Sequence, residues 1–247
     1  MAKNNSDSGM NVTKGKLFWR TQRECWRRMV TPYMMYLFMS MLLLATQEIS
    51  AEGLTWLRIL LGVICILIGA AFNAHLSYNT GVTHYDAYLT GCIHRRNIEQ
   101  GIVSGGDHHP EREYAPWKGF YIGFLIGVPV ILFAGLACIP GAMGSAMGRV
   151  MLVMFAGFAI IPVSWAYGGF GGGVPAGAYA WSMLMVLLPI IVSGVFYIVG
   201  ALVDKRRKQV LEEKKEAEEA AKNAPKVYRE QTQEQKRKTM QSKKKKR

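Results

Sequence analysis

The chain has 247 residues, 50% of them hydrophobic, and it carries a formal net charge of +13. A soluble domain would need polar helices to cover so many apolar residues, and the sequence has none between its two ends. The charge lies at the ends instead, with a net +5 in residues 1–30 and a net +9 in residues 204–247. This separation excludes an ordinary soluble domain and predicts an all-α integral membrane protein, a helical bundle with basic ends.

The first 30 residues form a basic arm with the pattern of an amphipathic interfacial helix. In LFWRTQRECWRR, one side of a helix would hold apolar residues and the rest would hold arginines. Tryptophan beside arginine suits the headgroup layer, where the ring is half buried and the guanidinium meets lipid phosphate. The apolar side consists of Phe18, Trp19, Cys25, Trp26 and Met29. The arginines that would bind lipid or nucleic acid are Arg20, Arg23, Arg27 and Arg28.

Five apolar segments follow, and together they define a transmembrane domain over residues 31–203. They cover residues 31–47, 54–76, 119–140, 149–167 and 179–203. A helix needs about 20 apolar residues to cross the hydrocarbon core of a bilayer. The second, third and fifth segments meet this length, whereas the first and fourth are at its lower limit.

The distribution of lysine and arginine predicts the orientation of the chain. Cytoplasmic flanks collect these residues, so the basic arm places the N-terminus inside and the tail after Asp204 places the C-terminus inside as well. Five full crossings would leave the termini on opposite sides of the membrane. We therefore expect four full spans and one apolar segment that does not cross.

The fourth segment, residues 149–167, is the one expected to enter the membrane and return. It is short, contains Pro162 and leads into YGGFGGGVPAGAY, where glycine and proline are too dense for a stable helix. Non-helical backbone at membrane depth needs protein or a wet cavity around it. A re-entrant or broken segment would bring both termini to the cytoplasm. The alternative is a flexible outer loop over residues 168–178 with the N-terminus outside.

The polar loop over residues 77–118 holds the side chains that come nearest to a metal or acid–base site. These candidates are His84, His94, Asp107, His108 and His109. Metal ligation needs donors that converge from a rigid frame, but Gly91 separates the first two and Pro110 places the others in a turn. We therefore expect no metal site. A polar cap is favoured, with an amphipathic helix over residues 83–102 on the inner surface. Its lipid side would hold Tyr85, Tyr88, Leu89, Cys92 and Ile93.

The tail over residues 204–247 has two parts. Residues 204–223 have glutamate and lysine at spacings of three and four with abundant alanine, which favours an exposed helix that continues the last span. Beyond Pro225 too few large apolar residues remain for a core, so disorder is expected. The charge suits anionic lipid headgroups, and RNA, for example on a ribosome, is the alternative. The binding residues would be Lys236, Arg237, Lys238, Lys243, Lys244, Lys245, Lys246 and Arg247.

The sequence carries no motif of a membrane enzyme. A nucleophile elbow, a zinc-binding helix motif, a P-loop and an aspartate-rich magnesium motif are all absent. The four cysteines lie far apart and predict neither a disulfide framework nor a redox pair. We therefore expect no catalytic residue, no cofactor and no specific DNA binding.

These observations favour a non-enzymatic partner, scaffold or assembly subunit of a membrane complex. Its partners would be membrane lipids with anionic headgroups, and another membrane protein or the ribosome. Two alternatives remain open. One is a small transporter or channel subunit that uses the glycine-rich segment 149–179, and the other is a membrane enzyme or metal-binding protein that uses loop 84–113.

Overall fold

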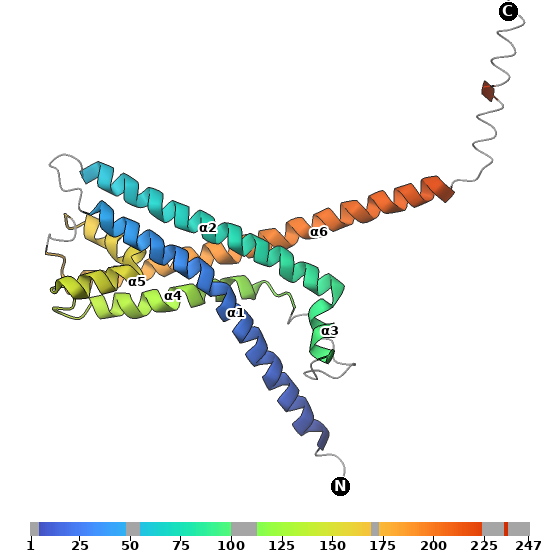
Figure 1. Cartoon of the computed structure of the whole chain (residues 1–247), viewed down its shortest axis with the longest axis horizontal. Coiled ribbons are helices and arrows are strands. Elements are labelled where there is room, and N and C mark those ends of the chain that lie inside the picture. Colours follow the sequence, from blue (N-terminus) through green and yellow to red (C-terminus); the bar gives the residue numbers. More distant parts are fainter. Residues whose placement is uncertain (1–4, 48–54, 100–112, 169–172, 224–234, 237–247) are drawn as a thin grey trace, which may run out of the picture. The chain divides into compact units, whose positions relative to one another are not determined.

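The computed structural model describes residues 5–47, 55–99, 113–168, 173–223 and 235–236. Within these ranges all the regular elements are helices (Figure 1). In chain order they are α1 (Asn5–Thr46), α2 (Thr55–Thr90), α3 (Cys92–Glu99), α4 (Trp117–Ala137), α5 (Ala146–Trp165), the 3-10 helix η2 (Ala176–Val186) and α6 (Leu187–Asn223). The chain divides into two compact units, Met1–Asp204 and Lys205–Arg247.

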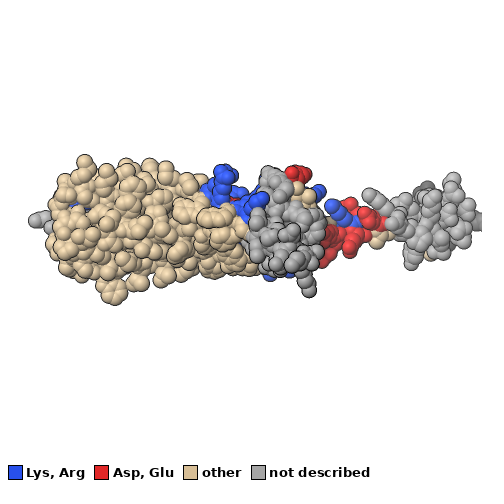
Figure 2. Space-filling model, turned by 90° about the horizontal axis from the view of Figure 1, so that it is seen from below, with Lys and Arg blue, Asp and Glu red and all other residues tan. Residues whose placement is uncertain are grey.

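Five helices are long and apolar enough to cross a membrane. They are Phe18–Thr46, Thr55–Thr90, Trp117–Ala137, Ala146–Trp165 and Ala176–Ala220. This confirms the predicted all-helical chain with five apolar segments, and by length and composition the protein is an integral multi-pass membrane protein. Figure 2 shows a long stretch of surface almost without charged side chains, with lysine and arginine gathered beside one end of it.

Two helices extend well beyond the apolar segments of the sequence. α1 is continuous from the arm into the first apolar segment, although Pro32 lies within it, so the arm and the first apolar segment form one helix. α2 continues past residue 76 to Thr90, where Gly91 has a φ of 60° and turns the chain into α3. The single amphipathic helix expected over residues 83–102 was therefore wrong, because its residues divide between α2 and α3.

Glycines let α6 approach two other helices within the first unit. Gly81 of α2 lies directly against the backbone carbonyl of Tyr197, and a Cβ there would overlap that oxygen. On α4, a Cβ at Gly123 would lie 2.6 Å from the Cα of Ile190. Small residues at such contacts allow helix backbones to pack closely, as is common in membrane bundles.

The contacts of α1, α2 and α6 follow a consistent order along the helices. Glu24 of α1 and Tyr197 of α6 both contact His84, in the last two turns of α2. Further into the bundle, Asn73 of α2 bonds to Tyr36 of α1. α1 and α2 are therefore antiparallel. We call the end with Glu24, His84 and Tyr197 the junction end, and the opposite end, where α1 ends and α2 begins, the loop end.

α4 and the helix formed by η2 and α6 are antiparallel as well. Gly119, in the first turn of α4, lies against Tyr197, and Gly127, two turns further along, lies against Val186 at the end of η2. α4 therefore begins at the junction end and ends at the loop end, whereas η2 begins at the loop end.

α5 differs from the other long helices because it is broken near its middle. Ala156 has non-helical backbone angles (φ −134°, ψ 18°), and Pro162 lies in the second half. Just past the break, the backbone N–H of Phe158 donates to Ser40 Oγ at 3.1 Å, and Ser40 donates to the carbonyl oxygen of Tyr36 at 2.9 Å. α1 thus supplies a partner where the helical hydrogen-bond pattern of α5 is interrupted.

The loops on either side of α5 lie together. Residues from 139–144, which precede the helix, and from 173–179, which follow it, line one open hollow. This hollow is at the loop end, where α4 ends and η2 begins (Figure 1). Trp165, the last residue of α5, packs against Gly62 near the start of α2. Both ends of α5 are therefore close to the loop end.

We expect Gly81→Ala to destabilise the protein by about 1–3 kcal/mol, because the added methyl group would overlap the carbonyl oxygen of Tyr197 and push α2 away from α6. Gly177→Ala is the matched control, since no atom lies within 4 Å of a Cβ at that position. Unfolding in detergent measures both variants. Equal stability of the two would contradict the close contact of α2 with α6.

Candidate functional site

His84 joins three helices at the junction end. Its Nδ1 lies 2.9 Å from the hydroxyl oxygen of Tyr197 on α6, and its Nε2 lies 3.0 Å from Oε1 of Glu24 on α1. The second contact is close but is not aligned as a hydrogen bond. A tautomer with its proton on Nε2 suits both contacts, because Tyr197 then donates to Nδ1 while Nε2–H faces the carboxylate. We call these three side chains the junction.

Burial and ring packing fix the geometry of the junction. His84 is 1% exposed and Tyr197 is 0% exposed. The imidazole meets the ring of Tyr197 edge-on at 5.6 Å, and the ring of Tyr114 stacks on Tyr197 at 5.6 Å with an interplanar angle of 9°. Gly81, almost one turn before His84 on α2, leaves the space that brings Tyr197 within reach. The junction therefore depends on the close approach of α2 and α6.

A buried lysine and a buried glutamate hold the loop that leads into α4. Nζ of Lys118 donates to the backbone carbonyl oxygen of Glu113 at 2.9 Å, and the Glu113 carboxylate accepts from the backbone N–H of His94 at 2.8 Å. In the same loop, burial raises the pKa of Tyr114, and the nearby Tyr85 raises it further. α3 and the start of α4 are thus held together beside the junction.

A second polar network lies deeper in the bundle, around Asn73. Its Oδ1 accepts hydrogen bonds from Ser193 at 3.1 Å and from Ser77 at 3.4 Å, and its Nδ2 donates to the hydroxyl oxygen of Tyr36 at 3.4 Å. Asn73 is fully buried. Since a buried amide without partners is costly, these bonds favour one arrangement of α1, α2 and α6.

The junction places a carboxylate, an imidazole and a hydroxyl group in order, an arrangement that can move a proton or activate a hydroxyl group. A substrate would have to reach the phenol oxygen of Tyr197. That residue is fully buried, with His84 and Tyr114 against its ring. The geometry therefore supports a contact between helices and does not support catalysis at this position.

The residues that the structure describes contain no group of three or more His, Cys, Asp and Glu side chains that could hold a metal ion. His84 belongs to the junction, and His94 lies in α3, so these two candidates have separate surroundings. Asp107, His108 and His109 lie outside the described residues.

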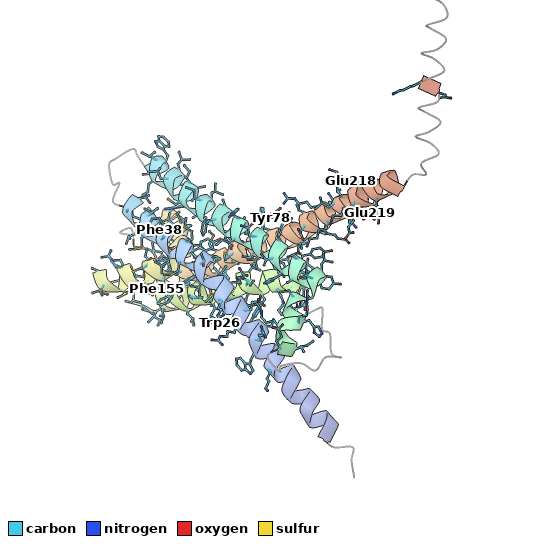
Figure 3. All side chains as sticks on the ribbon, turned by 45° about the vertical axis from the view of Figure 1, so that its right-hand side comes forward. Trp26, Phe38, Tyr78, Phe155, Glu218 and Glu219 are labelled. Carbon is cyan, nitrogen blue, oxygen red and sulfur yellow. The ribbon has the colours of Figure 1, made fainter. Side chains whose placement is uncertain are left out.

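The arm of α1 presents a basic and aromatic side to the surroundings. Arg23, Arg27 and Arg28 are exposed, and Arg20 is partly exposed. Trp19 and Trp26 are 72% and 48% exposed, and Figure 3 shows Trp26 on α1. The arginines and tryptophans of the arm are thus available to surrounding molecules.

The apolar residues of the arm divide between two environments, contrary to the single apolar side expected from the sequence. Cys25 is 1% exposed and Met29 is 8% exposed, and both belong to the hydrophobic core, whereas Phe18 is half exposed. The hydroxyl group of Tyr121 on α4 also donates to Gln22 of this buried side. The prediction was wrong because a spacing of three and four does not separate a protein-facing side from a lipid-facing one.

In the second unit, Lys205, Arg206 and Arg207 are exposed on α6, and Lys236 is exposed. The other predicted binding residues of the tail lie outside the described residues. They are Arg237, Lys238, Lys243, Lys244, Lys245, Lys246 and Arg247.

Compared with known proteins, the chain matches no family model, no curated protein and no solved structure. Sequence reasoning did not identify Glu24, Tyr197, Lys118 or Glu113 as members of buried polar contacts. A signal existed for two of them. Glu24 is the one acidic residue among the arginines of the arm, and Lys118 directly precedes an apolar segment.

We expect Glu24→Gln and His84→Gln each to destabilise the protein by about 1–3 kcal/mol, because each change weakens a contact of a buried partner. The double variant should lose less than the sum of the two. Arg23→Gln, on the exposed side of the same helix, is the control and should stay within about 0.5 kcal/mol of the parent. Strictly additive losses in denaturant unfolding would show that the two side chains do not interact.

Proposed function

We propose that this protein is a non-enzymatic, multi-pass partner or scaffold subunit of a membrane complex, with basic cytoplasmic surfaces that bind anionic lipid headgroups. The observation that carries this proposal is the arm of α1, whose arginines and tryptophans are exposed while its Cys25 side packs into the bundle. The surface is therefore held in a fixed position relative to the bundle. Binding to such a surface requires no catalytic cavity.

The chemistry of the arm suits phospholipid headgroups. One side of the helix holds two tryptophans and two arginines, because these residues lie three or four positions apart from Arg23. They are Trp19, Arg23, Trp26 and Arg27. A guanidinium group binds phosphate oxygens through two parallel hydrogen bonds, and indole rings favour the headgroup layer. Each basic residue near an anionic surface contributes about 1 kcal/mol. The lysine-rich end of the tail would add to this attraction.

For the topology, our proposal is four full crossings with both termini in the cytoplasm. It is supported by the contacts of α1, α2, α4 and the η2–α6 helix, each of which runs between the junction end and the loop end. The start of α1 and the residues just after Tyr197 on α6 then belong to the same side. The positive charges flanking both helices favour the cytoplasm for that side.

In this topology α5 is a re-entrant element that enters from the outer side and returns. Its two halves, before and after Ala156, are each about 15 Å long, roughly half of the hydrocarbon core. The loops before and after it share one hollow. Ser40 of α1 provides the hydrogen bond that a helix broken within the membrane requires.

Labelling with a membrane-impermeant thiol reagent in intact cells tests the topology, in a background without the native cysteines. Asn5→Cys and Met240→Cys should resist the reagent. Met147→Cys and Tyr167→Cys, at the two ends of α5, should both react, because both residues are exposed and the proposed topology puts them on the outer side. Labelling of position 5 or 240, or of only one end of α5, contradicts the four-span arrangement.

The lipid proposal predicts that purified protein retains phosphatidylglycerol in preference to phosphatidylcholine, as measured by native mass spectrometry. Arg23→Gln/Arg27→Gln should lower this preference by about tenfold or more, since two phosphate contacts are lost. Lys214→Gln/Lys215→Gln, which removes the same charge among the glutamates of α6, is the matched control. A preference that survives the arginine changes defeats the proposal, and stronger salt-sensitive binding to ribosomal RNA would favour RNA as the partner.

A further inference from the structure

We infer that Arg58, at the loop end of the bundle, is the centre of a binding site for an oxyanion of the phosphate class. Arg58 lies in the first turns of α2, at the opposite end of the bundle from the arm. The inference is therefore independent of the lipid contacts proposed for the arm.

Arg58 is a buried cation with little to balance its charge in the described part of the protein. The residue is 8% exposed. Its Nη2 donates to the backbone carbonyl oxygen of Gly168 at 3.4 Å, which is long for a hydrogen bond. Among the described residues, its Nε is buried without a partner and no carboxylate forms an ion pair with it. A buried charge in this condition calls for a counterion.

A second buried donor near Arg58 lacks a partner among the described residues. It is Nε1 of Trp165, the last residue of α5. Gly62, four residues after Arg58 on α2, lies against the indole ring of Trp165. Since residues four apart share one face of a helix, the guanidinium group and the indole lie on the same side of α2 at the loop end.

The donors at this place specify the ligand. A guanidinium group and an indole N–H donate hydrogen bonds and accept none, so the complementary group is an acceptor with negative charge. The flat fork of arginine matches two oxygens of a phosphate. The C-terminal end of α5 has partial negative charge that offsets some of the charge of Arg58 but leaves its Nε without an acceptor.

The source of the phosphate group is either a lipid headgroup or a phosphate in solution. Trp56, on the first turn of the same helix, is 63% exposed, as is common for tryptophan at the headgroup level. Both sources present the same oxyanion to Arg58. They differ in their acyl chains, so they can be separated by experiment.

The test uses the purified full-length protein in an uncharged detergent. Inorganic phosphate and a short-chain phosphatidylglycerol are titrated separately while thermal unfolding and tryptophan fluorescence are recorded. We expect the melting temperature of the parent protein to rise by roughly 5–10 °C near saturation with one titrant or both. A response to inorganic phosphate assigns a soluble ligand, and a response to the lipid alone assigns a headgroup.

Three variants make the test specific to Arg58. Arg58→Gln should abolish the response, and Arg58→Lys, which keeps the charge and loses the fork, should weaken binding by about tenfold or more. Arg149→Gln, which removes a basic residue from the start of α5, should respond like the parent and is the control.

The remaining variant addresses the linker between α1 and α2. Glu48 and Glu52 lie in it, outside the described residues, and Glu48→Gln/Glu52→Gln removes both carboxylates. The proposal expects this variant to keep the phosphate response. It is overturned if the parent protein responds to neither titrant, if Arg58→Gln still responds, or if the response appears only when the linker carboxylates are removed, because they would then be the counterion of Arg58 in the parent protein.

Discussion

The contact between His84 and Tyr197 is the interaction on which the packing of the first unit depends. To place the hydroxyl group of Tyr197 2.9 Å from the imidazole, α2 and α6 must approach until Gly81 touches the backbone of Tyr197. The same ring lies against Gly119 of α4, and the same imidazole reaches Glu24 of α1. Four helices thus meet around one tyrosine, and a larger side chain at either glycine would displace it.

The sequence predicted the number and order of the apolar helices because the transfer of apolar residues into lipid dominates their formation. It placed the end of α2 too early. Thr80 and His84 lie beyond the apolar run, yet Thr80 bonds to the carbonyl oxygen of Leu76 and His84 finds its partners on other helices. A polar residue ends a hydrophobic run in the sequence, but it does not end a helix when the helix and its neighbours satisfy the polar groups.

The junction could not be predicted for a different reason. Tyr197 is 113 residues from His84, and their pairing depends on how α2 and α6 are rotated about their axes. Gly81 and Gly119 fix that rotation by allowing contact on one side only, but a glycine in an apolar segment does not reveal which helix it will meet. The sequence therefore marked His84 as a candidate polar residue. Its partners on α1 and α6 could be identified only from the packing of the three helices.

The two ends of the bundle differ in how they balance charge. At the junction end, the Glu24 carboxylate lies beside the His84 imidazole, and the buried Lys118 donates to the backbone carbonyl oxygen of Glu113. These contacts resist opening, because separating their members would leave charged or polar groups buried without them. At the loop end, the described residues give Arg58 a single long contact to a carbonyl oxygen. A buried charge is costly wherever it lacks partners. A charged ligand would therefore gain the most free energy by binding beside Arg58 at the loop end.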